Sequence, residues 1–90
     1  MPLYTFIMEY SGGTYVSQVK ASSPRSACIK WARNLDVSQV GALSLKSKDS
    51  LIEQMKTELP APIDGMSNVW CAAALLRGGL ALINFVRTDQ

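Results

Sequence analysis

The chain has 90 residues, of which 48% are hydrophobic and 18% are charged, and it carries a net charge of +2. This composition excludes an intrinsically disordered chain, and the length predicts a single domain over residues 1–90. A domain of this size buries only about two-thirds of the surface that its unfolded chain exposes, so a second subunit would add stability.

The cysteine content and the N-terminal segment indicate the cellular compartment in which the protein is expected. Two cysteines, Cys28 and Cys71, are too few for the disulfide framework of a small secreted domain. The opening segment MPLYTFIMEY lacks the basic start and the apolar core of a signal peptide. We therefore expect a cytoplasmic protein with free thiols.

The first predicted element is a β-hairpin in which LYTFIMEY and TYVSQVKA flank the pair Gly12-Gly13. Glycine reaches the positive φ that a two-residue hairpin turn requires. Pairing Ser11 with Thr14 places alternate residues on opposite faces of the hairpin. The face predicted to be buried carries Tyr4, Phe6, Met8, Tyr10, Tyr15, Val19 and Ala21, and the wetter face carries Thr5, Ile7, Glu9, Val16, Gln18 and Lys20.

A helix is predicted next, with Ser23 as its N-cap and Pro24 at the first helical position. Apolar residues then recur at helical spacing and define one buried side. These residues are Ala27, Cys28, Trp31, Ala32 and Leu35, and the opposite side carries Arg25, Ser26, Lys30, Arg33 and Asn34.

The middle of the chain contains a second predicted helix. It begins near Asp49 or Ser50, because Ser50 and Glu53 have the spacing of a capping box, and it ends before Pro60. Residues 42–45, ahead of this helix, form either part of a loop or a short edge strand. The following LPAPIDGMSN is expected to be a rigid connector.

Residues 69–86, VWCAAALLRGGLALINFV, form either a membrane-spanning helix or a second hairpin. Arg77 at the centre of a bilayer would cost about 2.5–3.5 kcal/mol, and each glycine inside a helix costs about 1 kcal/mol. A Gly78-Gly79 turn avoids both costs, so we predict a hairpin and no membrane segment. One face carries Trp70, Ala72, Ala74, Leu76, Ala81, Ile83 and Phe85, and the other carries Val69, Cys71, Ala73, Leu75, Leu80, Leu82 and Val86.

The order ββααββ predicts a two-layer α+β domain, in which the two Gly-Gly hairpins form a four-stranded antiparallel sheet with two helices on one face. The predicted core joins residues of both hairpins and both helices: Phe6, Met8, Trp70, Phe85, Trp31, Leu35, Leu51 and Met55. This arrangement leaves Val69, Leu75, Leu80, Leu82 and Val86 on the outer face of the sheet. The opposite orientation of the C-terminal hairpin remains open.

Self-association is the function that this arrangement favours, because a hairpin that is apolar on both faces needs cover on both sides. We expect a homodimer or a higher homo-oligomer that uses Val69, Leu75, Leu80, Leu82 and Val86, and a different partner protein could use the same surface.

The alternative is a nucleic-acid-binding regulator. The segment 20–48 carries a charge of +5 and contains Arg25, Lys30, Arg33, Lys46 and Lys48, which could contact phosphates if they lie together.

An enzyme is not expected. The chain has no histidine, the commonest general base near neutral pH, and its acidic residues are scattered. No cofactor and no metal site are predicted.

Overall fold

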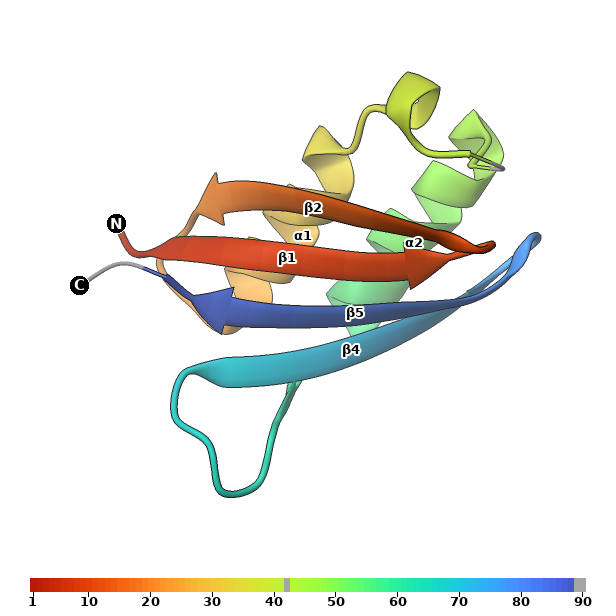
Figure 1. Ribbon diagram of the computed structural model, residues 1–90. Coiled ribbons are helices and arrows are strands. Elements are labelled where there is room, and N and C mark those ends of the chain that lie inside the picture. The colour runs from red at the N-terminus through yellow and green to blue at the C-terminus, as the bar shows by residue number, and fades with distance from the viewer. Residues whose placement is uncertain (42, 89–90) are drawn as a thin grey trace.

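The computed structural model describes residues 1–41 and 43–88 (Figure 1). In chain order the elements are β1 Leu3–Tyr10, β2 Gly13–Lys20, α1 Pro24–Asn34, the short 3-10 helix η1 Val37–Gln39, α2 Leu45–Thr57, β3 Ala61–Pro62, β4 Val69–Leu76 and β5 Gly79–Arg87. The strands form one antiparallel sheet in the order β2-β1-β5-β4-β3, and α1 and α2 lie side by side behind one face of it.

The predicted α+β class is confirmed, with both helices on one face of an antiparallel sheet. The prediction of four strands is wrong by one strand. The fifth, β3, is a two-residue strand that pairs with β4 and lies inside the segment expected to be only a connector. The alternative of a membrane-spanning helix over residues 69–86 is excluded, because β4 and β5 occupy this segment.

Both hairpin turns lie one residue earlier than the Gly-Gly pairs predict. Tyr10 pairs with Gly13, so that Ser11 and Gly12 form the first turn, with φ of 49° and 81°. In the second hairpin Leu76 pairs with Gly79. Each shift changes the pairing by two positions, and side chains alternate with a period of two, so every predicted face is retained.

The predicted start of α1 is confirmed. Ser23 is the N-cap, its hydroxyl accepts a hydrogen bond from the Ser26 N–H, and Pro24 follows in the first turn. The predicted start of α2 near Asp49 or Ser50 is wrong, because the helix begins at Leu45 with Ser44 as the N-cap. Its first turn, Leu45 to Lys48, is mostly polar and Leu45 is 70% exposed, so hydrophobic periodicity gives no signal there.

The core lies between the helices and the inner face of the sheet, as predicted. Phe6 is fully buried and stacks between Trp31 and Phe85, with ring centroids 5.1 and 4.4 Å away. Trp70 extends this aromatic row by stacking on Phe85 at 5.4 Å. Because Trp70 and Phe85 face the helices, the question of which face of the C-terminal hairpin points outward is settled.

Glycine at position 78 is required by close packing and not by the φ angle of the turn, because the positive φ in this turn region belongs to Gly79. The Gly78 N–H donates to the Tyr10 hydroxyl at 3.1 Å, and a Cβ at this position would collide with that hydroxyl. We expect Gly78→Ala to displace Tyr10 from the core and to lower the free energy of unfolding by about 1–3 kcal/mol in urea titrations.

Gly41→Ala is the matched control for this substitution. A Cβ at position 41 would lie 3.5 Å from the Tyr15 hydroxyl, which is an ordinary contact. The control is expected to change the free energy of unfolding by less than about 1 kcal/mol, in either direction. Equal effects of the two substitutions would show that Tyr10 does not constrain position 78.

Candidate functional site

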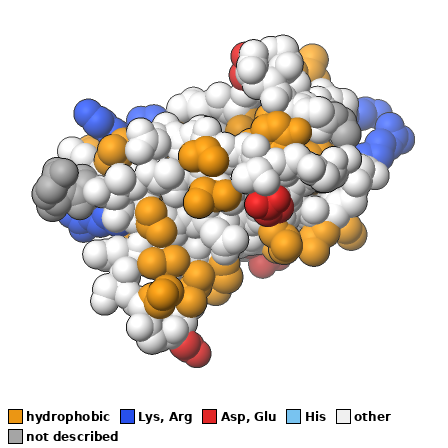
Figure 2. Space-filling view, in the orientation of Figure 1, with side chains coloured by type: hydrophobic (Ala, Val, Ile, Leu, Met, Phe, Trp, Pro, Cys, Tyr) orange, Lys and Arg blue, Asp and Glu red, His pale blue; other side chains and the backbone are white. Residues whose placement is uncertain are grey.

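The structure places all five residues predicted for self-association on the face of the sheet that points away from the helices. We call Val69, Leu75, Leu80, Leu82 and Val86 the outer patch. They are arranged as cross-strand neighbours, because Leu75 pairs with Leu80 and Val69 pairs with Val86. Figure 2 shows hydrophobic side chains gathered over β4 and β5 and over the loop that leads into β4.

The outer patch is most exposed near the β4–β5 turn. Leu75 is 72% exposed, Leu80 54% and Leu82 47%, whereas Val69 and Val86 are half-buried. Cys71 pairs with Asn84 and separates the leucines from the two valines. The patch is therefore two apolar areas on either side of one polar amide.

A hollow of about 510 Å³ adjoins the outer patch. Its lining includes Leu59, Ala61, Cys71, Ala73 and Leu82, and it lies where the chain passes from the end of α2 to the β3–β4 edge. Leu59 is itself 72% exposed. The outer face therefore offers both projecting leucines and an apolar recess.

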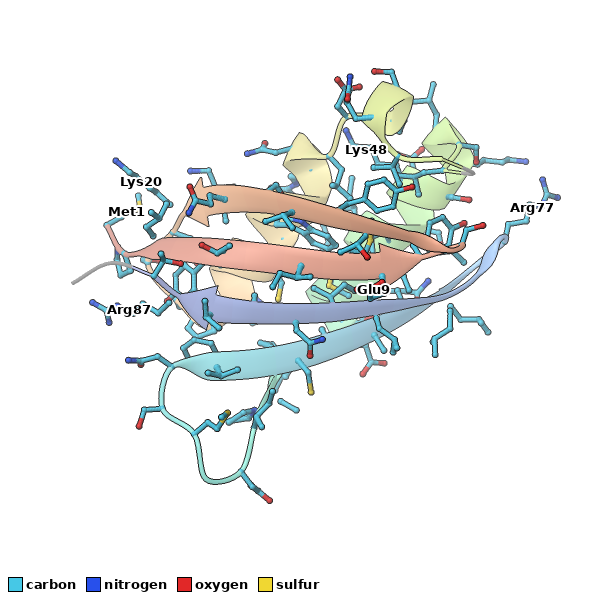
Figure 3. The ribbon with its side chains drawn as sticks, in the orientation of Figure 1. Met1, Glu9, Lys20, Lys48, Arg77 and Arg87 are labelled. Carbon is cyan, nitrogen blue, oxygen red and sulfur yellow. The ribbon has the colours of Figure 1, made fainter. Side chains whose placement is uncertain are left out.

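Glu9 lies next to the outer patch but does not form a catalytic pocket. Its carboxylate accepts a hydrogen bond from the Thr14 hydroxyl at 2.8 Å, and Glu9 pairs with Leu82 across β1 and β5. It is exposed and is not among the residues that line the hollow beside the outer patch. Figure 3 shows it near the end of β1 on the open side of the sheet.

The two thiols differ in environment. Cys28 is buried under the sheet and burial raises its pKa to about 12, whereas Cys71 is half-buried on the outer face. Because only the thiolate is nucleophilic, iodoacetamide at mildly alkaline pH is expected to alkylate Cys71 in the native protein and Cys28 only after unfolding. Mass spectrometry of peptides after a timed quench would measure both rates. Equal rates would contradict the buried position of Cys28.

The raised pKa of Cys28 also has a consequence for stability. In the unfolded chain the thiol ionises at its ordinary pKa of 9.0, whereas in the folded protein it stays protonated up to about 12. The burial of this thiol therefore favours the folded state fully below pH 9, and this contribution is lost as the pH rises from 9 towards 12.

The structure does not bring the five predicted basic residues together. Lys30 and Arg33 line one hollow, and Lys46 lines a separate one beside Arg77. Figure 3 shows Lys48 above the helices and well apart from Lys20, which lines the hollow of Lys30 and Arg33.

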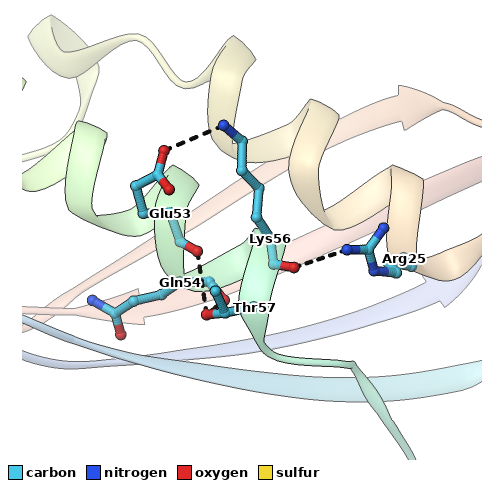
Figure 4. Close-up of polar contacts among 5 residues, drawn as sticks. All are labelled: Arg25, Glu53, Gln54, Lys56 and Thr57. Carbon is cyan, nitrogen blue, oxygen red and sulfur yellow. Dashed lines mark hydrogen bonds and ion pairs between the residues drawn. The ribbon is translucent and has the colours of Figure 1, made fainter.

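Three of these basic side chains donate hydrogen bonds to backbone carbonyl groups. Arg25 Nη2 donates to the Lys56 carbonyl near the C-terminal end of α2 at 2.8 Å, as Figure 4 shows. Lys48 Nζ donates to the Leu35 carbonyl at 2.7 Å, just after α1, and Lys30 Nζ donates to the Lys20 carbonyl at 2.8 Å. Cations near helix C-termini stabilise the helix dipole, so Arg25 and Lys48 have a role within the fold.

Lys20 and Lys56 are basic residues outside the five that are predicted to contact phosphates. With Lys30 and Arg33 they line a hollow of about 430 Å³, which we call the basic hollow. Among residues 1–41 and 43–88 no acidic side chain lines it, although Glu53 forms an ion pair with Lys56 at 3.2 Å. No local pattern predicts this grouping, because Lys56 reaches it from α2 through the packing of α2 on α1.

Within residues 1–41 and 43–88, no three cysteine, aspartate or glutamate side chains are grouped as metal ligands, and no helix is long and apolar enough to cross a membrane. The comparisons with known proteins do not identify a relative. No family model, no curated protein sequence and no solved structure matches this chain.

Proposed function

We propose that this protein is a non-enzymatic interaction module of the cytoplasm that self-associates through the outer patch. The observation that carries the proposal is the position of three exposed leucines, Leu75, Leu80 and Leu82, on the sheet face opposite α1 and α2. Contiguous exposed apolar surface of this kind is typical of interaction sites in soluble proteins.

Fully burying a leucine side chain contributes about 1.5–3 kcal/mol relative to leaving it exposed. A dimer interface of standard size buries about 800 Å² on each partner. The accessible surface of the whole chain is 5295 Å², so such an interface would use less than a sixth of it. The outer face of β4 and β5, with the adjoining hollow, is the surface that we assign to this interface.

A second copy fits this face better than an unrelated partner does, because the face carries complementary features. In a two-fold dimer the same surface patch is used by both copies, so each projection must meet a recess. Leu75 and Leu80 project near the turn, and the hollow beside Ala73 and Leu82 is a recess on the same face. The Asn84 amide has both donors and acceptors, so two copies of Asn84 can hydrogen-bond to each other.

Sedimentation equilibrium over nanomolar to high micromolar concentrations tests the proposal. We expect the average mass to rise with concentration from the 9.8 kDa of one chain towards a multiple of it. A mass that stays at one chain over the whole range, with the protein soluble, would overturn self-association.

Binding of a nucleic acid is the second candidate, and the basic hollow is the observation that favours it. Four cationic side chains from β2, α1 and α2 surround one recess, where they could meet successive phosphates. The test is the affinity for a DNA or RNA duplex as a function of salt concentration. Affinity that falls with salt and is reduced by Lys30→Glu or Arg33→Glu would support this candidate, and no measurable binding at low salt would remove it.

A further inference from the structure

The free edge of β2 is the feature that the proposed self-association does not use. β2 is the last strand of the sheet on its side. The Ala21 N–H donates to the Pro2 carbonyl on the β1 side, and the Lys20 carbonyl accepts from Lys30 on the other side. Because backbone groups in an antiparallel strand alternate in direction, Thr14, Val16 and Gln18 direct their N–H and C=O groups towards the open edge.

The opposite edge of the sheet is protected. β3 pairs with β4 at Cys71 and Trp70, and Pro62 in β3 cannot donate a backbone hydrogen bond. Further along β4, the Gln54 side chain accepts from the Leu75 N–H at 3.0 Å and donates to the Leu75 carbonyl at 2.9 Å. The Gln54 amide therefore satisfies both the N–H and the C=O group of Leu75, as the backbone of a neighbouring strand would.

The β2 edge has no comparable cover. Among residues 1–41 and 43–88, no backbone or side-chain group is hydrogen-bonded to the outward N–H and C=O groups of Thr14, Val16 and Gln18. Natural proteins protect long edge strands with proline, bulges or charged residues, and residues 13–19 contain none of the charged or proline residues. An open edge of this length is a template for one more strand.

A groove runs beside this edge on the helix side of the sheet. It has a volume of about 470 Å³, which lies in the range of pockets that bind ligands. Tyr15 and Val19 of β2 line it together with Trp31, Leu35 and Val40. The rest of the lining is mostly polar and includes Asp36, so the groove offers an apolar strip between polar side chains. A strand added to β2 would direct alternate side chains into this groove and the others towards the outer face.

We propose that the β2 edge binds an extended segment of a partner protein as an additional strand of the sheet. The segment carries apolar side chains at alternate positions, which enter the groove, and acidic residues at the end that lies nearest Lys20. Backbone hydrogen bonds to Thr14, Val16 and Gln18 supply affinity, and the side chains in the groove supply specificity.

The acidic end of the segment follows from the charge next to the groove. Asn34 lines both the groove and the basic hollow, so the two recesses adjoin at the C-terminal end of β2. Lys20, Lys30 and Arg33 lie there. Carboxylates that leave the groove at this end would meet three cationic side chains.

A single extended segment fits this site better than a second copy of the folded chain. The end of α1, η1 and the start of α2 extend past the β2 edge on the side of the helices, as Figure 1 shows. A second copy that paired its own β2 here would bring its α1 and η1 into the same space. A segment without a helix layer meets no such obstacle.

The test uses nitrogen-15-labelled protein and a synthetic peptide in which two glutamates precede three leucines that alternate with threonines, so that antiparallel pairing with β2 places the glutamates near Lys20. We expect amide shifts on titration to be confined to residues 13–20 and 31–41, and the outward amides of Thr14, Val16 and Gln18 to become protected from hydrogen exchange. Shifts centred on the outer patch, or no shifts at millimolar peptide, would overturn the proposal.

Val16→Pro removes one outward N–H without breaking a bond to β1, and Val16→Thr is the matched control that retains it. We expect the proline variant to bind the peptide at least about ten-fold more weakly and the threonine variant to bind within about two-fold of wild type. Amide spectra of both variants check that the fold is kept. If Val16→Pro unfolds the protein, a peptide methylated on alternate backbone nitrogens replaces it, and unchanged binding of that peptide would overturn the proposal.

Two further measurements separate this inference from the proposed self-association. A Leu80→Lys, Leu82→Lys variant is expected to bind the peptide as wild type does, because the outer patch and the β2 edge are different surfaces. If Val16→Pro instead abolishes self-association of the protein alone, the edge binds a second copy, and the partner segment is excluded as its occupant.

Discussion

The double substitution Leu80→Lys, Leu82→Lys is expected to weaken self-association at least about 100-fold, because it places four lysines of two copies in one interface that wild type fills with apolar side chains. Leu80 and Leu82 are about half exposed in the single chain. Their replacement is therefore expected to change the free energy of unfolding by less than about 1 kcal/mol. Lysine at position 82 would also lie across from Glu9, which is favourable.

Leu45→Lys is the matched control for the double substitution. Leu45 is 70% exposed, as strongly as the most exposed leucine of the outer patch, but it lies at the start of α2. The control is expected to leave the sedimentation profile of the wild type unchanged. Equal loss of association in both variants would mean that added charge, and not the outer patch, controls the assembly.

The substitution Phe6→Ala is expected to lower the free energy of unfolding by about 3–5 kcal/mol. Phe6 is fully buried between the rings of Trp31 and Phe85, so its removal leaves a cavity in the centre of the core and breaks two stacking contacts. Because domains of this size are stable by only about 5–15 kcal/mol, the loss is a large share of the total. Urea titration followed by tryptophan fluorescence measures it.

Ile7→Ala is the internal control for Phe6→Ala. Ile7 is the next residue of β1, but it points to the outer face and is 38% exposed. We expect its replacement to cost about 1 kcal/mol or less, as is usual for partly exposed strand positions. Similar costs at positions 6 and 7 would contradict the assignment of the two faces of β1.

The faces of the sheet could be predicted from the sequence, because moving a two-residue turn by one residue shifts the register by two and leaves side-chain alternation unchanged. The Gly-Gly pairs marked both hairpins correctly but misplaced both turns by one residue. The first turn uses Ser11 and Gly12 at positive φ, and the second uses Arg77 and Gly78, whose N–H donates to the Tyr10 hydroxyl. The outer patch was therefore found with all five of its members on one face.

The start of α2 and the short strand β3 could not be predicted by periodicity. The first turn of α2 exposes Leu45 and depends on the Ser44 cap, and a cap alone is a weak signal among the many serines of residues 38–50. β3 forms because Ala61 and Pro62 pair with β4. This pairing is a tertiary contact, so it leaves no periodic pattern in the local sequence. The possible edge strand over residues 42–45 includes Ala42, which lies outside the described residues, and Leu45 belongs to α2.

The positions of the basic residues show that closeness along the sequence does not predict closeness on the surface. Arg25, Lys30, Arg33, Lys46 and Lys48 are close in sequence, but they belong to two helices with different directions and reach different parts of the surface. Lys56 joins Lys30 and Arg33 only because α2 packs on α1. The open edge of β2 could not be predicted from the sequence either, because the strand order depends on the pairing of β1 with β5.

Intermolecular contacts measured by isotope-filtered NMR, in a mixed sample of labelled and unlabelled protein, test self-association through the outer patch most directly. We predict intermolecular NOEs that join methyl groups of Leu75, Leu80 and Leu82 in one copy to the outer face of β4 and β5 in another. An associated protein whose intermolecular NOEs lie only on the helix layer or along the β2 edge would contradict the account.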